Sequence, residues 1–238
     1  MEKELNYNLL TAKEIRWLYN HRCKLHNRRY SEHPHCFFHD HPNATRPSEV
    51  EERVGFWDIE TSNLDANFGI MITWSILDGD SNKVISDYLR DEDFAKNKNA
   101  QEMFSVDKRL VAHLIDELFK FDRIVTHYGR KFDIPFTRTR AFINHIPFPG
   151  FGSLFNDDTY YMARNKMKLN SNRLDVIARA LLGHSDKTHL DGAIWTSAAR
   201  GDKESIQYIL EHNKIDVIEL KKIWDVLHQY VGFNHTSI

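Results

Sequence analysis

Residues 54–64, VGFWDIETSNL, place two carboxylates, Asp58 and Glu60, in an otherwise apolar run. In a β-strand residues i and i+2 share a face, so both acids project together with Phe56, while the residues on either side of Asp58 take the opposite face. Both faces carry large apolar side chains, which predicts a strand that is partly covered on each side. Neighbouring anions that lose solvation repel each other, and a bound divalent cation relieves this repulsion. The alternative is a pair of exposed acids at the end of a strand.

The composition limits the class of protein. The 238 residues suit one main domain with room for a small accessory module, and 41% apolar with 28% charged residues is an ordinary soluble composition. No apolar run approaches the ~18 to 20 residues that a bilayer span needs, and the start MEKELNYNLL lacks the apolar core of a signal peptide, so we expect a cytoplasmic protein without a membrane partner. Because the net charge is −2, any nucleic acid must meet a local basic surface.

The sequence around the acidic run predicts a mixed α/β sheet. Three β-rich stretches follow one another from residue 53, and their connections are rich in Gly, Asp and Asn, which favours an antiparallel meander. Helical and extended patterns then alternate, which predicts helices packed on the same sheet. The expected strands are residues 53–60, 69–77, 83–89 and 123–129, and the expected helices are residues 107–120, 133–145, 174–183 and 203–230.

The first 52 residues differ from the rest of the chain. Residues 11–20, TAKEIRWLYN, predict a short helix that begins at Thr11, with Glu14 completing a capping box. Residues 21–52 show little periodicity and few aliphatic side chains, so they need a staple or a host surface. We therefore expect an N-terminal extension over residues 1–52 and a main domain over residues 53–238.

A staple is predicted within residues 21–41, HRCKLHNRRYSEHPHCFFHDH, which hold both cysteines and six of the fourteen histidines. Zinc prefers thiolate and imidazole ligands, and a structural site needs four of them. A CxxH pair followed by an HxxC pair predicts one structural Zn²⁺ held by Cys23, His26, His33 and Cys36. Competing ligands are His35, His39 and His41, and the alternative is a His-rich surface loop with two buried thiols.

Two further acidic positions stand out. Asp133, in THYGRKFDIPF, follows a strand and a Gly-containing turn at the expected start of a helix, where an acid can also serve as a simple N-cap. His212 and Asp216, in YILEHNKIDVIEL, lie four residues apart and share one face of a helix, a pairing that is common by chance. Each position alone is uninformative, but their order along the chain is specific.

That order resembles the DEDD 3′→5′ exonuclease superfamily, which has a ribonuclease-H-like fold. The resemblance covers about residues 53–226, with DxE in the first strand at Asp58 and Glu60, FDxP at Asp133, and the last acid at Asp216. NDDTYYMAR, with Asp158 and Thr159, and SNRLDVIARALLG after it are similar to stretches in the branch related to the exonuclease domains of family B DNA polymerases.

The resemblance implies metal-dependent 3′→5′ hydrolysis of phosphodiester bonds, with single-stranded DNA as the expected substrate. Its four carboxylates, Asp58, Glu60, Asp133 and Asp216, would hold two Mg²⁺ or Mn²⁺ ions, one to activate water and one to stabilise the departing 3′ oxygen. By the family pattern, Glu60 also lies near the attacking water. An exoribonuclease or RNA-trimming enzyme of the same fold is the enzymatic alternative, and a binding or interaction module with a vestigial site is the alternative of another class.

The chain departs from the family pattern at His212. One subgroup has Tyr three intervening residues before the last Asp, and another has His four before it, whereas this chain has His at the tyrosine spacing. A histidine with an unperturbed pKa of ~6.5 can accept the proton of water at neutral pH. His212 is therefore the candidate base, and Tyr208, one helical turn earlier, is the alternative.

Candidate substrate contacts follow from position. The family typically uses the residues just after DxE for the terminal nucleotide, which points to Asn63 and Leu64, while Tyr128 and Phe132 are further candidates whose alternative is the core. Basic residues expected to track a phosphate backbone, or else to form a solvated face, are Arg130, Lys131, Arg138, Arg140, Arg164, Lys166, Lys168 and Arg173. The expected partner is a single-stranded 3′ end, with a replication, repair or defence complex as a further possibility.

Overall fold

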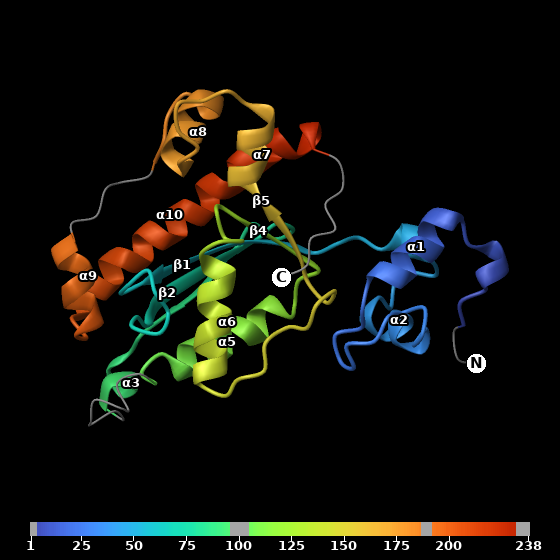
Figure 1. The fold of residues 1–238 in the computed structure, drawn as a ribbon, viewed down its shortest axis with the longest axis horizontal. Helices are drawn as coiled ribbons and strands as arrows, with labels where there is room; N and C mark the ends of the chain where they lie inside the picture. Colours follow the sequence, from blue (N-terminus) through green and yellow to red (C-terminus); the bar gives the residue numbers. More distant parts are fainter. Residues whose placement is uncertain (1–3, 96–104, 187–191, 232–238) are drawn as a thin grey trace.

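A five-stranded mixed sheet forms the centre of the computed structural model, which describes residues 4–95, 105–186 and 192–231 (Figure 1). The strands are β1 (Val54–Thr61), β2 (Met71–Asp78), β3 (Val84–Tyr88), β4 (Arg123–Thr126) and β5 (Phe155–Asp158), in the order β3-β2-β1-β4-β5. β1, β2 and β3 pair antiparallel, and β4 and β5 extend the sheet in parallel with β1. The predicted mixed sheet and its meander are confirmed.

β5 was not predicted from the sequence. Its four residues, FNDD, contain one apolar side chain, so they show neither a continuous apolar run nor an alternation. The strand is nevertheless buried because its polar groups are hydrogen-bonded: the Asn156 amide donates to the Ile124 carbonyl (3.3 Å) and to the Thr126 hydroxyl (3.0 Å) on β4. Hydrogen bonds thus replace apolar burial at this edge of the sheet.

Helices cover both faces of the sheet. The helices of the described residues are α1 (Ala12–Asn20), α2 (His35–Asp40), α3 (Asp91–Ala95), α5 (Lys108–Leu118), α6 (Asp133–Ile143), α7 (Thr159–Lys166), α8 (Leu174–Leu182), α9 (Gly192–Ala199) and α10 (Lys203–Leu227), with 3₁₀ turns at Tyr7–Leu9, Pro47–Glu49 and His228–Tyr230. The four predicted helices of the main domain correspond to α5, α6, α8 and α10. Gly183 ends α8 in the left-handed region (φ +82), as its sequence position indicates. None of the helices in the described residues is long and apolar enough to span a membrane.

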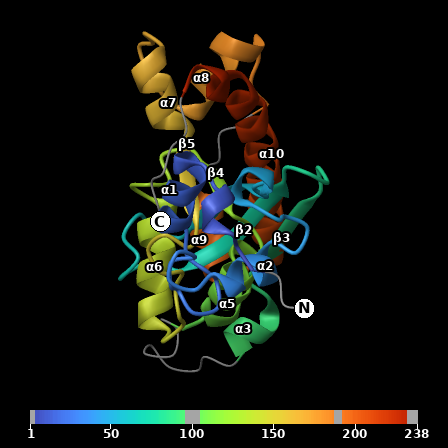
Figure 2. The ribbon, with the colours of Figure 1, turned by 90° about the vertical axis from the view of Figure 1, so that its right-hand side faces the viewer.

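Side chains that alternate along β1 pack into two hydrophobic clusters, one on each face of the sheet. Trp57 packs with residues of α5 and α6, including Leu114 and Ile134, whereas Phe56 packs on the opposite face with Val217 of α10 and Ile177 of α8. α7 and α8 lie together beside the C-terminal half of α10 (Figures 1 and 2). Asp58 and Glu60, two and four residues after Phe56, therefore face α10.

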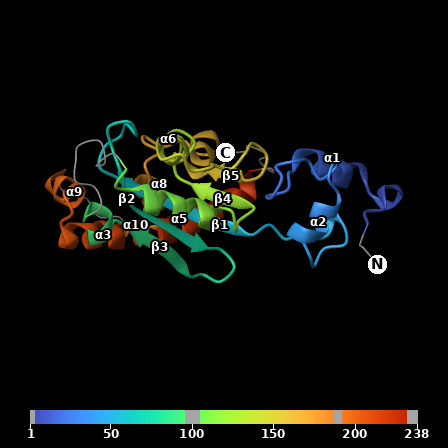
Figure 3. The ribbon, with the colours of Figure 1, turned by 90° about the horizontal axis from the view of Figure 1, so that it is seen from below.

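The N-terminal segment has a small core of its own and lies to one side of the sheet (Figures 1 and 3). α1 begins after Thr11 with the predicted capping box, and Leu18 from this helix packs with Tyr30 and Phe37. α2 was not predicted because six residues in a His-rich stretch carry no helical period. The proposed boundary between residues 52 and 53 stays a prediction.

Charged side chains connect the N-terminal segment to the sheet. Glu52 binds the Arg123 guanidinium of β4 (2.6 Å), and Arg123 also binds Asp157 of β5 (3.0 Å). Lys24 pairs with Asp122, one residue before β4, at 3.0 Å. These ion pairs are mostly shielded from water, so breaking one of them leaves a poorly solvated charge.

Glu52 makes this contact sensitive to acid. Burial raises its pKa, but hydrogen bonds and charges from His21 and Arg123 outweigh burial and lower the pKa to about 2. A carboxyl group whose pKa is lowered on folding stabilises the folded protein at pH values above its unfolded pKa of ~4.3. This stabilisation is lost as the pH falls toward 2. We expect Glu52→Gln to lower the free energy of unfolding by on the order of 2–3 kcal/mol at pH 7 and by about half as much at pH 3. Urea unfolding at both pH values measures this, with the exposed Glu51→Gln as control; an equal difference at pH 7 and pH 3 would contradict it.

Candidate active site

Three of the four predicted acids converge where α10 crosses β1. Carboxylate oxygens of Asp58, Glu60 and Asp216 all lie within 4.8 Å of one another. Asp216 is buried and the two acids of β1 are partly buried. Across the sheet, Asp58 is opposite Ser75 and Glu60 is opposite Thr73, so small hydroxyl side chains on β2 leave room for the acids beneath α10.

Electrostatic repulsion makes this group a fitting cation site. At separations up to 4.8 Å, two ionised carboxylates repel by about 3 to 4 kcal/mol at an effective dielectric constant of about 20. Convergent carboxylate oxygens are the ligands that Mg²⁺ and Mn²⁺ prefer, and a divalent ion converts the repulsion into attraction. The donor set of Asp58, Glu60 and Asp216 therefore fits a hard divalent cation.

Asp133, the fourth acid, lies beside this group without belonging to it. The ladder between β1 and β4 ends at Phe56, and beyond it the Ile59 N–H donates to the Asp133 carboxylate at 3.2 Å. Asp133 is buried in the first turn of α6, and Phe132 occupies the N-cap position. Burial and the nearby charge of Asp58 raise the pKa of Asp133 well above its usual range. A cation bound at the acidic group would favour its ionised form.

A tight turn between β4 and α6 sets the position of Asp133. A Cβ at Gly129 would come within 2.4 Å of the Thr126 side chain, so only glycine fits here without a shift. Asp158 at the end of β5 accepts hydrogen bonds from the backbone N–H groups of Tyr128 (2.9 Å) and Arg130 (3.1 Å). The edge strand β5 thus fixes the turn that carries the fourth acid.

His212 lies one helical turn before Asp216 and is 9% exposed. Its ring meets that of Tyr208 at a centroid distance of 4.4 Å and an interplanar angle of 73°. Tyr208 is 46% exposed, so the alternative base is the more solvated of the two. Both side chains lie on the same side of α10 as the acidic group, because they precede Asp216 by four and eight residues.

Asn213 is a site residue that the sequence analysis missed. Its side-chain amide donates to Asp58 Oδ2 at 2.7 Å, and the residue is fully buried. The spacing of three residues from Asp216 on α10 was the signal that could have identified it. The hydrogen bond orients the Asp58 carboxylate and stabilises its charge.

Removal of this hydrogen bond should weaken metal binding. Groups that orient a ligating carboxylate typically contribute about 10- to 100-fold to metal affinity or activity. We expect Asn213→Ala to bind Mn²⁺ about 10-fold more weakly than the natural protein in calorimetric titrations. The matched control is Gln207→Ala on the exposed side of α10, and equal Mn²⁺ affinity in the two variants would contradict the assigned role.

The predicted substrate residues are placed unequally. Leu64 is 79% exposed and Tyr128 is 43% exposed. Asn63 is exposed, and its side chain accepts a hydrogen bond from the Asp65 N–H (3.1 Å). Phe132 is partly buried and packs against the core next to Phe136 (centroid distance 5.7 Å), which makes it the least accessible of the four.

The expectation for Arg140 is wrong. Its side chain is fully buried and binds Asp107 through two hydrogen bonds of 2.8 and 2.7 Å, so it cannot reach a phosphate backbone. The sequence placed it with exposed basic neighbours, but the residue lies on the inner side of α6, near Phe136 and Ala141 of the core. The remaining basic residues of the predicted set are exposed or partly exposed: Arg130, Lys131, Arg138, Arg164, Lys166, Lys168 and Arg173.

The family model of the RNase H superfamily matches residues 55–228, which hold all four acids. The chain belongs to the RNase H superfamily. Among solved structures, the family B DNA polymerase from the hyperthermophilic archaeon Pyrobaculum calidifontis is similar, with a TM-score of 0.55, 16% sequence identity and coverage of 74% of this chain and 25% of the polymerase chain. The search of curated proteins found no match. This chain thus spans about a quarter of the length of the polymerase it matches, and at this identity the likeness establishes the fold alone.

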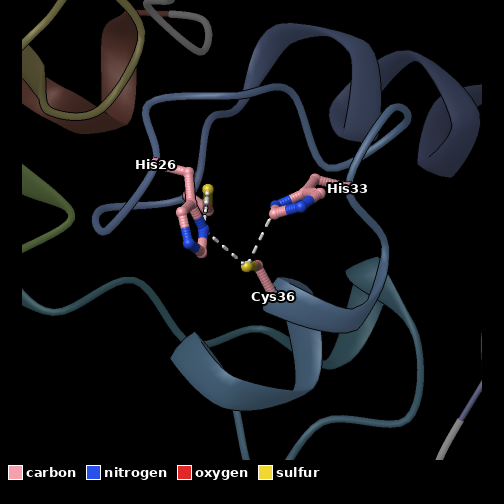
Figure 4. Close-up of side chains that lie close together, drawn as sticks. His26, His33 and Cys36 are labelled. Carbon is pink, nitrogen blue, oxygen red and sulfur yellow. Dashed lines mark hydrogen bonds between the residues drawn. The ribbon is translucent and has the colours of Figure 1, made fainter.

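The Cys/His group lies outside the segment matched by the RNase H superfamily. Cys23, His26, His33 and Cys36 place ligand atoms within 4.8 Å of one another, and Figure 4 shows the labelled side chains converging. His26 Nδ1 and His33 Nδ1 each lie 3.3 Å from Cys36 Sγ, and His26 Nδ1 lies 3.8 Å from Cys23 Sγ. Tetrahedral zinc with ordinary bond lengths separates sulfur from nitrogen by about 3.5 Å, so this group fits Zn²⁺.

The chemistry of the two thiols agrees with a metal site. Both cysteines are buried and neither forms a disulfide. Burial, with the hydrogen bond and charge of Cys23, raises the pKa of Cys36 to about 11. A bound zinc ion reverses this effect because it holds the thiolate. The competing His39 points its ring nitrogen at Asp40 (2.9 Å) and is not part of the group.

Proposed function

We propose that the protein is a metal-dependent 3′→5′ exonuclease that acts on single-stranded DNA. The observation that carries the proposal is the convergence of Asp58, Glu60 and Asp216 within 4.8 Å, with Asp133 beside Asp58, in a chain of the RNase H superfamily. The order of these acids along the chain is that of the DEDD pattern. Membership of a replication, repair or defence complex stays a prediction.

The chain's own residues define the chemistry. Divalent cations, when bound, supply charge neutralisation at the phosphodiester and acidify a water molecule. Asp58 and Asp216 are the proposed main ligands, Asn213 holds the Asp58 carboxylate in place, and Asp133 completes the donor set. Glu60 positions the attacking water by hydrogen bonding, and His212 accepts its proton. The 3′ oxygen leaves as the P–O3′ bond breaks, which releases a nucleoside 5′-monophosphate.

The direction of degradation tests this proposal. A 20-nucleotide single strand labelled at its 5′ end should shorten stepwise in Mn²⁺ or Mg²⁺, and a phosphorothioate linkage at its 3′ end should stop the reaction. A circular single strand should resist. Cleavage of the circle would establish an endonuclease instead, and faster degradation of the matching RNA strand would make RNA the substrate.

His212 should show its role in the pH dependence of the reaction. General bases typically contribute about 10²- to 10⁴-fold, so we expect His212→Ala to lower kcat by about 10²-fold or more and to flatten the rise of kcat with pH that an ionising base produces. His212→Tyr tests whether the residue usual at this spacing can substitute. Tyr208→Phe is the matched control for its ring neighbour. An unaltered rate and pH profile in His212→Ala would assign the base elsewhere.

We also propose that Cys23, His26, His33 and Cys36 hold one structural zinc ion. The four ligand atoms account for a full tetrahedral set, which leaves no position for a reacting water. The loop between the two ligand pairs belongs to a segment whose core consists of few side chains, among them Leu18, Tyr30 and Phe37. Zinc would therefore supply stability that this small core lacks.

A further inference from the structure

Three tyrosines gather just after the ends of β4 and β5, one of them in the connection that leads to Asp133. Tyr128 lies between β4 and α6, and Tyr160 and Tyr161 lie in the first turn of α7. The Tyr128 ring lies 4.7 Å from that of Tyr160 and 6.3 Å from that of Tyr161, the latter at an interplanar angle of 25°. The Arg130 guanidinium lies 5.8 Å from the Tyr161 ring centroid. We call these four side chains the tyrosine platform.

The platform is at the surface rather than in the core. Tyr128 is 43% exposed, Tyr160 and Tyr161 are partly exposed, and none of the three belongs to a core cluster. Tyr128 adopts a left-handed backbone (φ +64), which bulky residues rarely do. Asp158 holds that conformation through its hydrogen bond from the Tyr128 N–H. Asn156 anchors Arg130 at the other end of the platform (3.3 Å).

Positive charge continues from the platform along α7. Arg164 and Lys166 lie in the last turn of this helix, and Lys168 follows two residues later. All three are exposed and form no ion pair within the described ranges of the chain. We call these three residues the basic strip. Because these cations are unpaired and solvated, they can neutralise an anionic partner without first breaking an existing contact.

We propose that the tyrosine platform and the basic strip bind the single DNA strand that leads into the acidic site, with bases stacked on the tyrosines and phosphates facing the strip. The inference rests on the proposed function. Tyr128 lies five residues before Asp133, in the connection between β4 and α6, so a strand whose 3′ end lies at the acids passes the platform upstream of that end. Rings followed by cations suit exposed base faces and phosphates, whereas the bases of a duplex are stacked on each other.

Equilibrium binding tests the platform separately from catalysis. In an Asp58→Asn background, fluorescence anisotropy of 5′-labelled dT20 is measured for the Tyr160→Ala/Tyr161→Ala pair. Stacking contributes about fivefold or more per base, so we expect at least about a 20-fold loss of affinity, while the Phe pair, which keeps the rings, stays within about threefold. A blunt duplex of 20 base pairs should bind at least about tenfold more weakly than dT20.

The basic strip has its own readout. Each phosphate contact on a single strand adds about 0.7 to the slope of log Kd against log salt concentration. Arg164→Ser/Lys166→Ser should therefore lower that slope by about 1.4, whereas Lys83→Ser/Lys108→Ser, which removes two exposed charges elsewhere, should not change it. An unchanged slope in the strip variant would remove these residues from the proposed path.

The outcomes for platform and function are distinguishable. Equal affinity of the Ala pair and its background protein for dT20, together with degradation of dT20 by the natural protein, would overturn the platform and leave the exonuclease. Loss of affinity in the Ala pair, with no degradation of any nucleic acid by the natural protein, would overturn the exonuclease and leave the platform. Equal binding of duplex and single strand would also overturn the platform.

Discussion

Asp58→Asn should lower the rate of phosphodiester hydrolysis by at least about 10³-fold while the protein stays folded, because a divalent cation supplies several kcal/mol of charge stabilisation at this site. The substitution keeps the shape of the side chain and its contact with Asn213 but removes one anion from a group within 4.8 Å. Because the substitution relieves the repulsion among the carboxylates, metal-free Asp58→Asn should unfold at a higher temperature than the natural protein. Steady-state rates and thermal unfolding measure the two effects.

The opposite signs of these effects separate a functional from a structural role. Asp65→Asn removes an exposed carboxylate in the loop after β1 and serves as the matched control, with no expected change in rate or in the effect of metal. Mn²⁺ should raise the unfolding temperature of the natural protein and of Asp65→Asn but not that of Asp58→Asn. Unchanged hydrolysis in Asp58→Asn would show that the acidic group is not the reaction centre.

Cys23→Ser should release the zinc ion and unfold the N-terminal segment, which is the largest stability effect we expect. Structural zinc sites in small domains contribute on the order of 10 kcal/mol, far more than a core as small as this one can replace. Hydrogen exchange should show loss of amide protection in α1 and around Tyr30, while β1 and β2 stay protected. Zinc content, measured by metal analysis, should fall from one ion per chain to none.

His39→Ser is the control for the zinc prediction. The His39 side chain is 74% exposed and pairs with Asp40, so its removal changes the local His content but not the ligand group. It should keep a full equivalent of zinc and normal protection. A full equivalent of zinc in Cys23→Ser would exclude Cys23 as a ligand and restore His35 or His41 as candidates.

Elements with a strong period could be predicted from the sequence, and those held by polar contacts could not. α5 and α10 show apolar residues at helical spacing, and β1 to β3 are separated by clear turn residues, so their order and pairing followed. β5 depends on hydrogen bonds of Asn156 to its neighbour strand, which no local pattern encodes. The prediction for Arg140 was wrong for a related reason, because its partner Asp107 is 33 residues away along the chain. From the sequence alone, a buried ion pair cannot be told from two exposed charges.

Within the candidate site, local spacing was informative and long-range pairing was not. A two-residue period brought Asp58 and Glu60 to one face, and the CxxH and HxxC spacings predicted the Cys/His group that the structure assembles. Asp133 and Asp216 came from the resemblance in motif order, because nothing local links a turn and a distant helix to β1. Asn213 was missed since its partner, Asp58, is 155 residues away along the chain.

The identity of the first product tests the central claim most directly. Single-stranded DNA is incubated with the natural protein and Mn²⁺ in ¹⁸O-labelled water, and the earliest products are identified by mass spectrometry. A metal-dependent 3′→5′ exonuclease that breaks the P–O3′ bond should release nucleoside 5′-monophosphates carrying one ¹⁸O in the phosphate, and none without the metal. Release of 3′-monophosphates, of internal oligonucleotides, or of no product at all would contradict the account.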